Sequence, residues 1–215
     1  RLIISANVAD RDLRSAVNEI QQNIEKSVKL PENYYIVYGG QFESEAEASR
    51  TLALTSIGAL LIIFMLLYQE FKNTTHSLII LLNMPLAMIG GVIILKCTSG
   101  ELNIPAIIGF ISLLGITTRN GMLLISHYNS LKESGVGLIE RIMQGSADRL
   151  NPIIMTALTS ALALIPLALR GGEPGNEIQS PMAIVILGGL LSSTILNIFV
   201  VPIIYYLTSK KSENE

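Results

Sequence analysis

One arginine lies deep inside a long apolar segment, where a charged side chain needs a reason to be. The segment runs from Ile104 to His127, and Arg119 is well within it. A helix rises about 1.5 Å per residue, so this segment is long enough to cross a hydrocarbon core of about 30 Å. An arginine inside such a helix costs about 2.5–3.5 kcal/mol on insertion scales. We therefore expect Arg119 to have a specific partner and a function.

The small and polar residues of this segment fall on one helical face. Ser112, Gly115, Arg119 and Ser126 follow the 3.6-residue period, and Asn120 lies next to the arginine. We expect this face to contact protein rather than lipid. The alternative is an arginine that snorkels to the nearer membrane surface. Asn120 and the small-residue face argue against that alternative.

The chemistry of Arg119 depends on a partner that the sequence does not contain. No aspartate or glutamate lies within the five apolar segments of the chain. Because a buried guanidinium needs charge neutralisation and several acceptors, we expect carboxylates from transmembrane segments outside this chain. Arginine stays protonated in proteins and cannot itself carry a proton. It can supply a fixed positive charge that competes with a proton for a carboxylate, which suits proton-driven transport.

Two further residues could join Arg119 in a proton relay. Arg149 and Thr156 are seven residues apart, so they share a helical face if the helix around them begins early. Arg149 equally fits a cytoplasmic anchor before Pro152. Thr156 equally fits a hydroxyl bonded to a carbonyl of its own helix. Both interpretations stay open at this point.

Five apolar segments predict a membrane-embedded, all-helical bundle over residues 43–209, followed by a tail at 210–215. Each is close to the roughly 20 residues that span a bilayer. Half of the residues are hydrophobic and 15% are charged, as in a membrane protein with one polar lobe. Glycine pairs in the second and fifth segments, and Asn83 and Asn197 near prolines, predict close packing or kinks. The expected spans are 52–68, 77–95, 104–127, 152–169 and 181–207.

The composition also argues against several classes of site. No basic face indicates a nucleic-acid partner. A single cysteine, Cys97, excludes an internal disulfide. The two histidines sit at segment ends without a second ligand at metal spacing, and the seven methionines are scattered. We therefore expect neither a metal site nor a catalytic residue in this chain.

The polar lobe, residues 1–42, predicts a strand–helix–strand fragment of an α+β domain. Leu2–Val8 and Tyr34–Tyr38 have the composition of strands, and Asp10 can cap a helix between them. Such a fragment is too small to hold a core, so we expect other residues to complete its sheet. The chain begins with arginine, and we interpret it as a piece of a longer protein.

Lysine and arginine residues predict the orientation in the membrane. Most fall in the connections on one side, which the positive-inside rule makes cytoplasmic. The N-terminal lobe is then periplasmic, as is the loop 171–179. Between the third and fourth spans, Leu138–Ala147 can form an amphipathic helix along the cytoplasmic surface. The residues on the cytoplasmic side are Lys72, Lys132, Arg141, Arg149, Lys210 and Lys211.

Five motifs in this order resemble the C-terminal part of resistance–nodulation–division (RND) proton-driven efflux pumps. VADRDLRSAVNEIQ and YGGQFES favour the heavy-metal branch, the cobalt–zinc–cadmium and copper–silver pumps. The likeness covers nearly the whole chain. The motifs are YGGQFESEAEA, NMPLAMIGG, GFISLLGITTRNGMLLI, RLNPIIMTALTSALALIPLAL and GGLLSSTILNIFVVPIIYYL.

The resemblance implies a secondary active transporter of the bacterial inner membrane, not an enzyme. Such a pump is a homotrimer driven by the proton-motive force without a cofactor, and it works with a periplasmic adaptor and an outer-membrane channel. Residues 1–42 would end a ferredoxin-like periplasmic porter subdomain. Arg119 matches the basic residue that pairs with acidic residues of the first half, although the multidrug branch has lysine there. Arg149 and Thr156 match the arginine and threonine of that relay.

The function that we expect is export of heavy-metal cations by proton antiport. One alternative is the same machine exporting amphiphilic drugs, and another is a protein or lipid export component that shares the fold. A purely structural membrane subunit is also conceivable, but Arg119 argues against it.

Overall fold

The computed structural model describes residues 3–8, 13–31, 33–98, 102–171, 173, 175–176 and 178–213. The chain divides into two compact units, residues 1–53 and 54–215. The first contains helix α1 (Leu13–Ser27) and the start of helix α2 (Gln41–Phe71). The second contains the rest of α2 and all later helices.

The first unit has the predicted helix but not the predicted strands. Residues 3–8 and 34–39 form no regular structure, so the strands predicted at Leu2–Val8 and Tyr34–Tyr38 are wrong for this chain. The side chains of Ile4 and Tyr35 are 87% and 82% exposed. A strand needs a neighbouring strand for its backbone hydrogen bonds, and the described part of the chain offers none. Leu2 and Asp10 lie outside the described residues.

The five predicted spans are confirmed as five helices long and apolar enough to cross a membrane. They are α2, α3 (Thr74–Thr98), α4 (Ile104–Glu133), α5 (Leu138–Leu169) and a last helix in three parts. That last helix consists of α6 (Gln179–Ile195), a π-helical turn η1 (Leu196–Val200) and α7 (Val201–Glu213). Residues 138–147 are helical as predicted, but they are the first turns of α5 rather than a separate helix.

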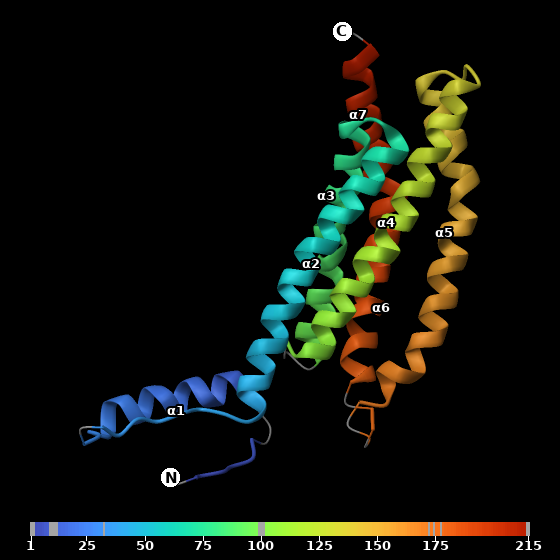
Figure 1. Ribbon diagram of the computed structural model, residues 1–215. Coiled ribbons are helices and arrows are strands. Elements are labelled where there is room, and N and C mark those ends of the chain that lie inside the picture. The colour runs from blue at the N-terminus through green and yellow to red at the C-terminus, as the bar shows by residue number, and fades with distance from the viewer. Residues whose placement is uncertain are drawn as a thin grey trace. The chain divides into compact units, whose positions relative to one another are not determined.

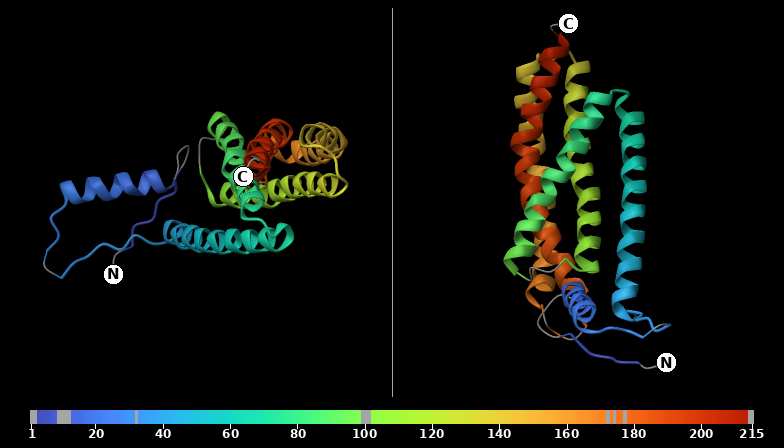
Figure 2. Two further views of the ribbon diagram at one scale, coloured as in Figure 1. Left: turned by 90° about the horizontal axis from the view of Figure 1, so that it is seen from above. Right: turned by 90° about the vertical axis from the view of Figure 1, so that its left-hand side faces the viewer.

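Within the second unit the helices run alongside one another and alternate in direction (Figures 1 and 2). The α2–α3 and α4–α5 connections lie at the same end of this bundle as the C-terminus (Figure 1). The α3–α4 and α5–α6 connections lie at the other end. The bundle therefore brings Lys72, Lys132 and Lys210 to one end, as an alternating path of five spans requires.

Helices α3 and α6 approach each other most closely, and glycine makes this possible. A Cβ atom on Gly90 would collide with the carbonyl oxygen of Gly188, and one on Gly188 would collide with that of Gly90. In lipid the hydrophobic effect does not drive helices together, so close van der Waals contacts of this kind stabilise their association. Ser192 reinforces the contact, because its hydroxyl donates to the carbonyl of Ala87 at 2.5 Å.

Two apolar clusters complete the packing. The larger joins α2, α3, α4 and α7 around Ile80, Leu124 and Tyr205. The smaller joins α3, α4 and α6 around Phe110 and Val185. Between them, the middle of α4 is held between α3 and the last helix and presents one face inward.

Candidate functional site

Arg119 lies on the outer, uncovered face of α4. Its side chain is exposed, as are those of Ser112 and Gly115 on the same face, while Ser126 is half-buried. A Cβ built on Gly115 would meet nothing within 4 Å. Within the part of the chain that the structure describes, no aspartate or glutamate pairs with Arg119. The face predicted to contact protein is therefore one that α3, α5 and α6 leave open.

Asn120 faces the opposite way. It is only 5% exposed and belongs to the inner face of α4 with Thr117 and Gly121. Its amide nitrogen Nδ2 is buried and has no hydrogen-bond partner among the residues that the structure describes. The structure thus does not join Asn120 to Arg119 in one polar patch, although the two are neighbours in the chain.

Arg149 and Thr156 are both half-buried on α5. The helix begins at Leu138, so the two residues do share a face, as an early start requires. The Thr156 hydroxyl donates to the carbonyl of Pro152 at 2.8 Å, which is the local bond considered as its alternative role. Among the described residues, no hydrogen bond or ion pair links either side chain to Arg119.

A buried polar seam joins α3, α4 and the last helix, and the sequence did not reveal it. We define the polar seam as Asn83, Thr117, Ser193 and Asn197, each at most 3% exposed. The amide of Asn83 donates to Oδ1 of Asn197 at 3.0 Å, and that of Asn197 donates to the Ser193 hydroxyl at 3.2 Å. The Thr117 hydroxyl donates to the same oxygen at 3.2 Å. The signal was present only as two asparagines near prolines.

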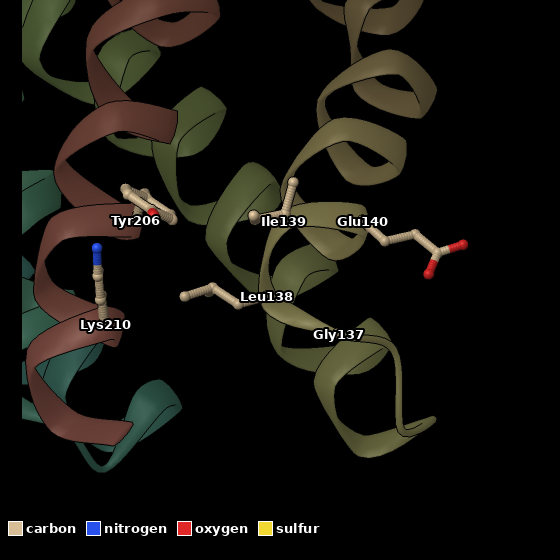
Figure 3. Close-up of a pocket in the computed structure, with 6 residues that line it drawn as sticks. All are labelled: Gly137, Leu138, Ile139, Glu140, Tyr206 and Lys210. Carbon is tan, nitrogen blue, oxygen red and sulfur yellow. The ribbon is translucent and has the colours of Figure 1, made fainter. Parts of the chain in front are cut away.

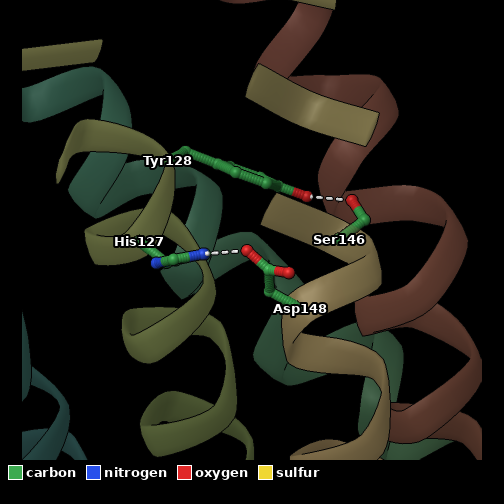
Figure 4. Close-up of polar contacts among 4 residues, drawn as sticks. All are labelled: His127, Tyr128, Ser146 and Asp148. Atoms are coloured by element: carbon green, nitrogen blue, oxygen red, sulfur yellow. Dashed lines mark hydrogen bonds and ion pairs between the residues drawn. The ribbon is translucent and has the colours of Figure 1, made fainter. Parts of the chain in front are cut away.

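A second polar cluster fastens α4 to α5 near the end of the bundle that carries the C-terminus (Figure 4). Nε2 of His127 lies 3.0 Å from Oδ2 of Asp148, and the Tyr128 hydroxyl lies 2.5 Å from that of Ser146. Arg141, predicted only as a charge on the cytoplasmic side, is 2% exposed, with its guanidinium carbon 5.9 Å from the centre of the Tyr205 ring. These contacts hold the first turns of α5 against α4 and α7.

A surface hollow at the same end is lined by none of the predicted site residues (Figure 3). Its volume is about 470 Å³, and it lies between the start of α5 and α7. Lys210 and Leu138 face it from opposite walls, while Glu140 points away (Figure 3). In the described residues, no three His, Cys, Asp or Glu side chains are grouped so that they could hold a metal ion.

Five apolar helices, held together by glycine contacts around a buried polar seam, define a multipass membrane protein. The chain belongs to the AcrB/AcrD/AcrF family, whose sequence profile matches residues 1–209. The resemblance to RND pumps is thereby confirmed.

Similar proteins include named metal-resistance and cation-efflux proteins. The chain is 38% identical over 214 residues to the cobalt-zinc-cadmium resistance protein CzcA of Cupriavidus metallidurans, with 100% of the chain and 20% of CzcA covered. It is 29% identical over 215 residues to the cation efflux system protein CusA of Escherichia coli, with 95% and 20% covered. A crystal structure of a heavy metal efflux pump matches with a TM-score of 0.83 at 34% identity, covering 94% of this chain and 20% of that one. The chain thus spans about one fifth of the length of these relatives.

Proposed function

We propose that this chain is the C-terminal part of an inner-membrane secondary active transporter that exports heavy-metal cations in exchange for protons. The similarity to metal-resistance proteins supports the substrate class. The observation that carries the mechanism is Arg119, an exposed arginine on an uncovered face of a membrane-spanning helix.

The uncovered face indicates what the rest of the pump supplies. Left in lipid, Arg119 would cost about 2.5–3.5 kcal/mol or more, and the small residues beside it would gain little from acyl chains. A second set of helices carrying carboxylates removes this cost, because it neutralises the guanidinium and packs closely against Ser112 and Gly115. The chain spans one fifth of its relatives, so such helices have room elsewhere in the protein.

The proton relay that we propose uses Arg119 as a fixed charge. While the partner carboxylate is ionised, the guanidinium holds it in a charge-assisted hydrogen bond. When the carboxylate takes up a proton, this attraction weakens and the two helix sets are free to shift. Asn120 anchors the inner side of α4 at the same level. Arg149 and Thr156 on α5 complete the relay in the assembled pump.

The assembly and orientation extend the same proposal. The N-terminal lobe lies in the periplasm as the end of a ferredoxin-like porter subdomain, completed by segments outside this chain. The C-terminus lies in the cytoplasm, supported by Lys72, Lys132 and Lys210 at that end of the bundle. The pump is a homotrimer that passes substrate to a periplasmic adaptor and an outer-membrane channel. It uses the proton-motive force and no cofactor.

The test is Arg119→Ala in the complete pump, reconstituted in proteoliposomes with an imposed pH gradient. Cobalt, zinc, cadmium, copper and silver ions are assayed separately, and an amphiphilic dye serves as the multidrug alternative. We expect Arg119→Ala to abolish metal-driven proton flux while metal binding by the same protein is retained, because only the relay is lost. Arg119→Lys should keep part of the flux, since a point charge still pairs with a carboxylate.

Lys132→Ala is the matched control, because it removes a positive charge from the exposed end of the same helix. It should pump like the wild type. Wild-type flux in Arg119→Ala would mean that Arg119 is only a snorkelling anchor. Proton flux driven by the dye and by none of the metals would show that the substrates are amphiphiles. It would not contradict the proposed proton relay.

A further inference from the structure

Two buried polar atoms, one in the polar seam and one beside it on α4, lack a partner among the described residues. They are Oδ1 of Asn83 and Nδ2 of Asn120. A buried polar group left unpaired costs about 1–3 kcal/mol. One of these atoms is an acceptor and the other is a donor. Water satisfies both kinds, whereas a cation would satisfy only the acceptor and an anion only the donor.

The last helix is irregular where it meets the seam. Pro202 has no N–H, so the carbonyl of Ile198 lacks the donor that a regular helix would supply four residues later. The helix widens into the π turn η1 immediately before this proline, and Asn197 is the buried residue of that turn. In membrane helices, carbonyls freed by proline are satisfied by π adjustments and by ordered water.

A cavity adjoins the seam at this turn. Its volume is about 130 Å³, and Asn197 and Ile198 line it together with Leu124 and Ser146. A cavity needs only about 10–15 Å³ of this kind of volume to hold one water molecule, provided that polar partners are present. Asn197 belongs both to the seam and to the wall, and the Ser146 hydroxyl adds a second polar group.

On α4, the residue that follows Asn120 reaches the same place. The next residue, Gly121, packs beside Asn197, since a Cβ built on it would lie 3.8 Å from Oδ1 of Asn197. Glycine at this position keeps the approach to the amide free of side-chain atoms. The side chain of Asn83, which carries the unpaired acceptor of α3, is bonded to Asn197, and Asn197 also lines the cavity.

We propose that ordered water binds in this cavity and completes the polar seam, between α4, α5 and the π turn. The water accepts from and donates to the amides of the seam and the Ser146 hydroxyl. The site is independent of the transported substrate. Because Asn120 also belongs to the proposed relay, the test measures hydration rather than transport, and either proposal can fail without the other.

The experiment is X-ray radiolytic footprinting of the complete pump, in which hydroxyl radicals form from water where it is bound and oxidise the side chains it touches. Leu124 and Ile198 line the cavity. On the same two helices, Leu113 is as buried as Leu124, Ile204 is partly buried like Ile198, and neither control lines the cavity. We expect several-fold faster oxidation of Leu124 than of Leu113, and of Ile198 than of Ile204. Equal rates in both pairs would overturn the proposal, and this comparison needs no variant.

A variant identifies what holds the water. Asn197→Leu keeps the branched shape and the number of heavy side-chain atoms and removes the amide, so the excess oxidation of Leu124 should be lost. Thr194→Val is the matched control, because the Thr194 hydroxyl bonds within its own helix, to the carbonyl of Leu190 at 2.7 Å, and Thr194 does not line the cavity. It should keep the wild-type pattern. Excess oxidation that persists in Asn197→Leu would show that the seam does not bind the water.

Discussion

At the scale of single residues, the middle of α4 separates two roles that the sequence places side by side. Successive residues of a helix are about 100° apart, so Arg119 and Asn120 serve different faces. Arg119 is exposed on the open face, and Asn120 is buried against α3 and the last helix. The apolar run alone located both residues in the membrane. Only the packing of the other helices assigned a face to each.

The bond between Asn83 and Asn197 could not be predicted, because the two residues are 114 positions apart. The same holds for Arg141, which is buried with its guanidinium over the Tyr205 ring of α7. A lone arginine in a polar stretch has the pattern of a loop charge. These contacts come from tertiary packing, which one sequence without an alignment does not encode in any local pattern.

The Asn83–Asn197 bond makes a prediction at this scale. Asn83→Leu alone should destabilise the pump by about 1–3 kcal/mol, because it leaves the Asn197 amide short of a partner. Asn83→Leu combined with Asn197→Leu should cost less than the sum of the single variants, since both polar groups are then gone. Thermal melting of the purified complete pump, read as a double-mutant cycle, measures the coupling. Additive losses would mean that the bond contributes nothing.

At the scale of elements, the spans were predictable because lipid leaves the backbone no other choice. A segment that crosses a bilayer must satisfy its own backbone groups, so apolar length alone predicts a helix. The five spans followed from that rule. No such rule supports the strands expected at 2–8 and 34–38, because a strand depends on neighbouring strands that its own residues do not specify.

The contact between α3 and α6 gives the prediction for this scale. Gly90→Ala should destabilise the pump by about 1–3 kcal/mol, as overpacking does, because the added Cβ meets the backbone of Gly188. Gly58→Ala is the control, since a Cβ there would meet nothing within 4 Å. That control should be neutral or stabilise by up to about 1 kcal/mol. Melting temperature and yield of folded pump report both, and similar behaviour of the two variants would refute the close contact.

At the scale of the whole molecule, the bundle has a centre and a periphery. Helices α3, α4 and the last helix bury much of their apolar stretch, whereas α2 and α5 bury little. The chain matches one fifth of its relatives, so the other four fifths of a protein of this family can cover the open faces, including that of Arg119. These open faces fit the proposal that the chain is one side of a larger transmembrane domain.

The alternating path of the helices predicts a topology. A reporter fused after Ser209 should be active only as a cytoplasmic marker, and one inserted within 171–179 only as a periplasmic marker. The C-terminal end of α7 and the α5–α6 connection lie at opposite ends of the bundle, so the two reporters must give different labels (Figure 1). Paired alkaline phosphatase and fluorescent protein fusions make the measurement. Matching labels would contradict the five spans, and swapped labels would reverse the proposed orientation.

The π turn in the last helix determines which side chains stay in line along it. Ser193, Asn197, Val201 and Tyr205 are all buried and are spaced four residues apart. In a regular helix, twelve residues at about 100° each would rotate the last of them about 120° away from the first. The π turn accommodates one extra residue and so removes about 100° of that rotation. One continuous stripe can therefore carry amides in the middle of the bundle and an aromatic ring at its end. Deleting a residue such as Phe199 would restore regular winding and still leave Tyr205 facing Tyr128, whereas regular winding without a deletion would turn Tyr205 away.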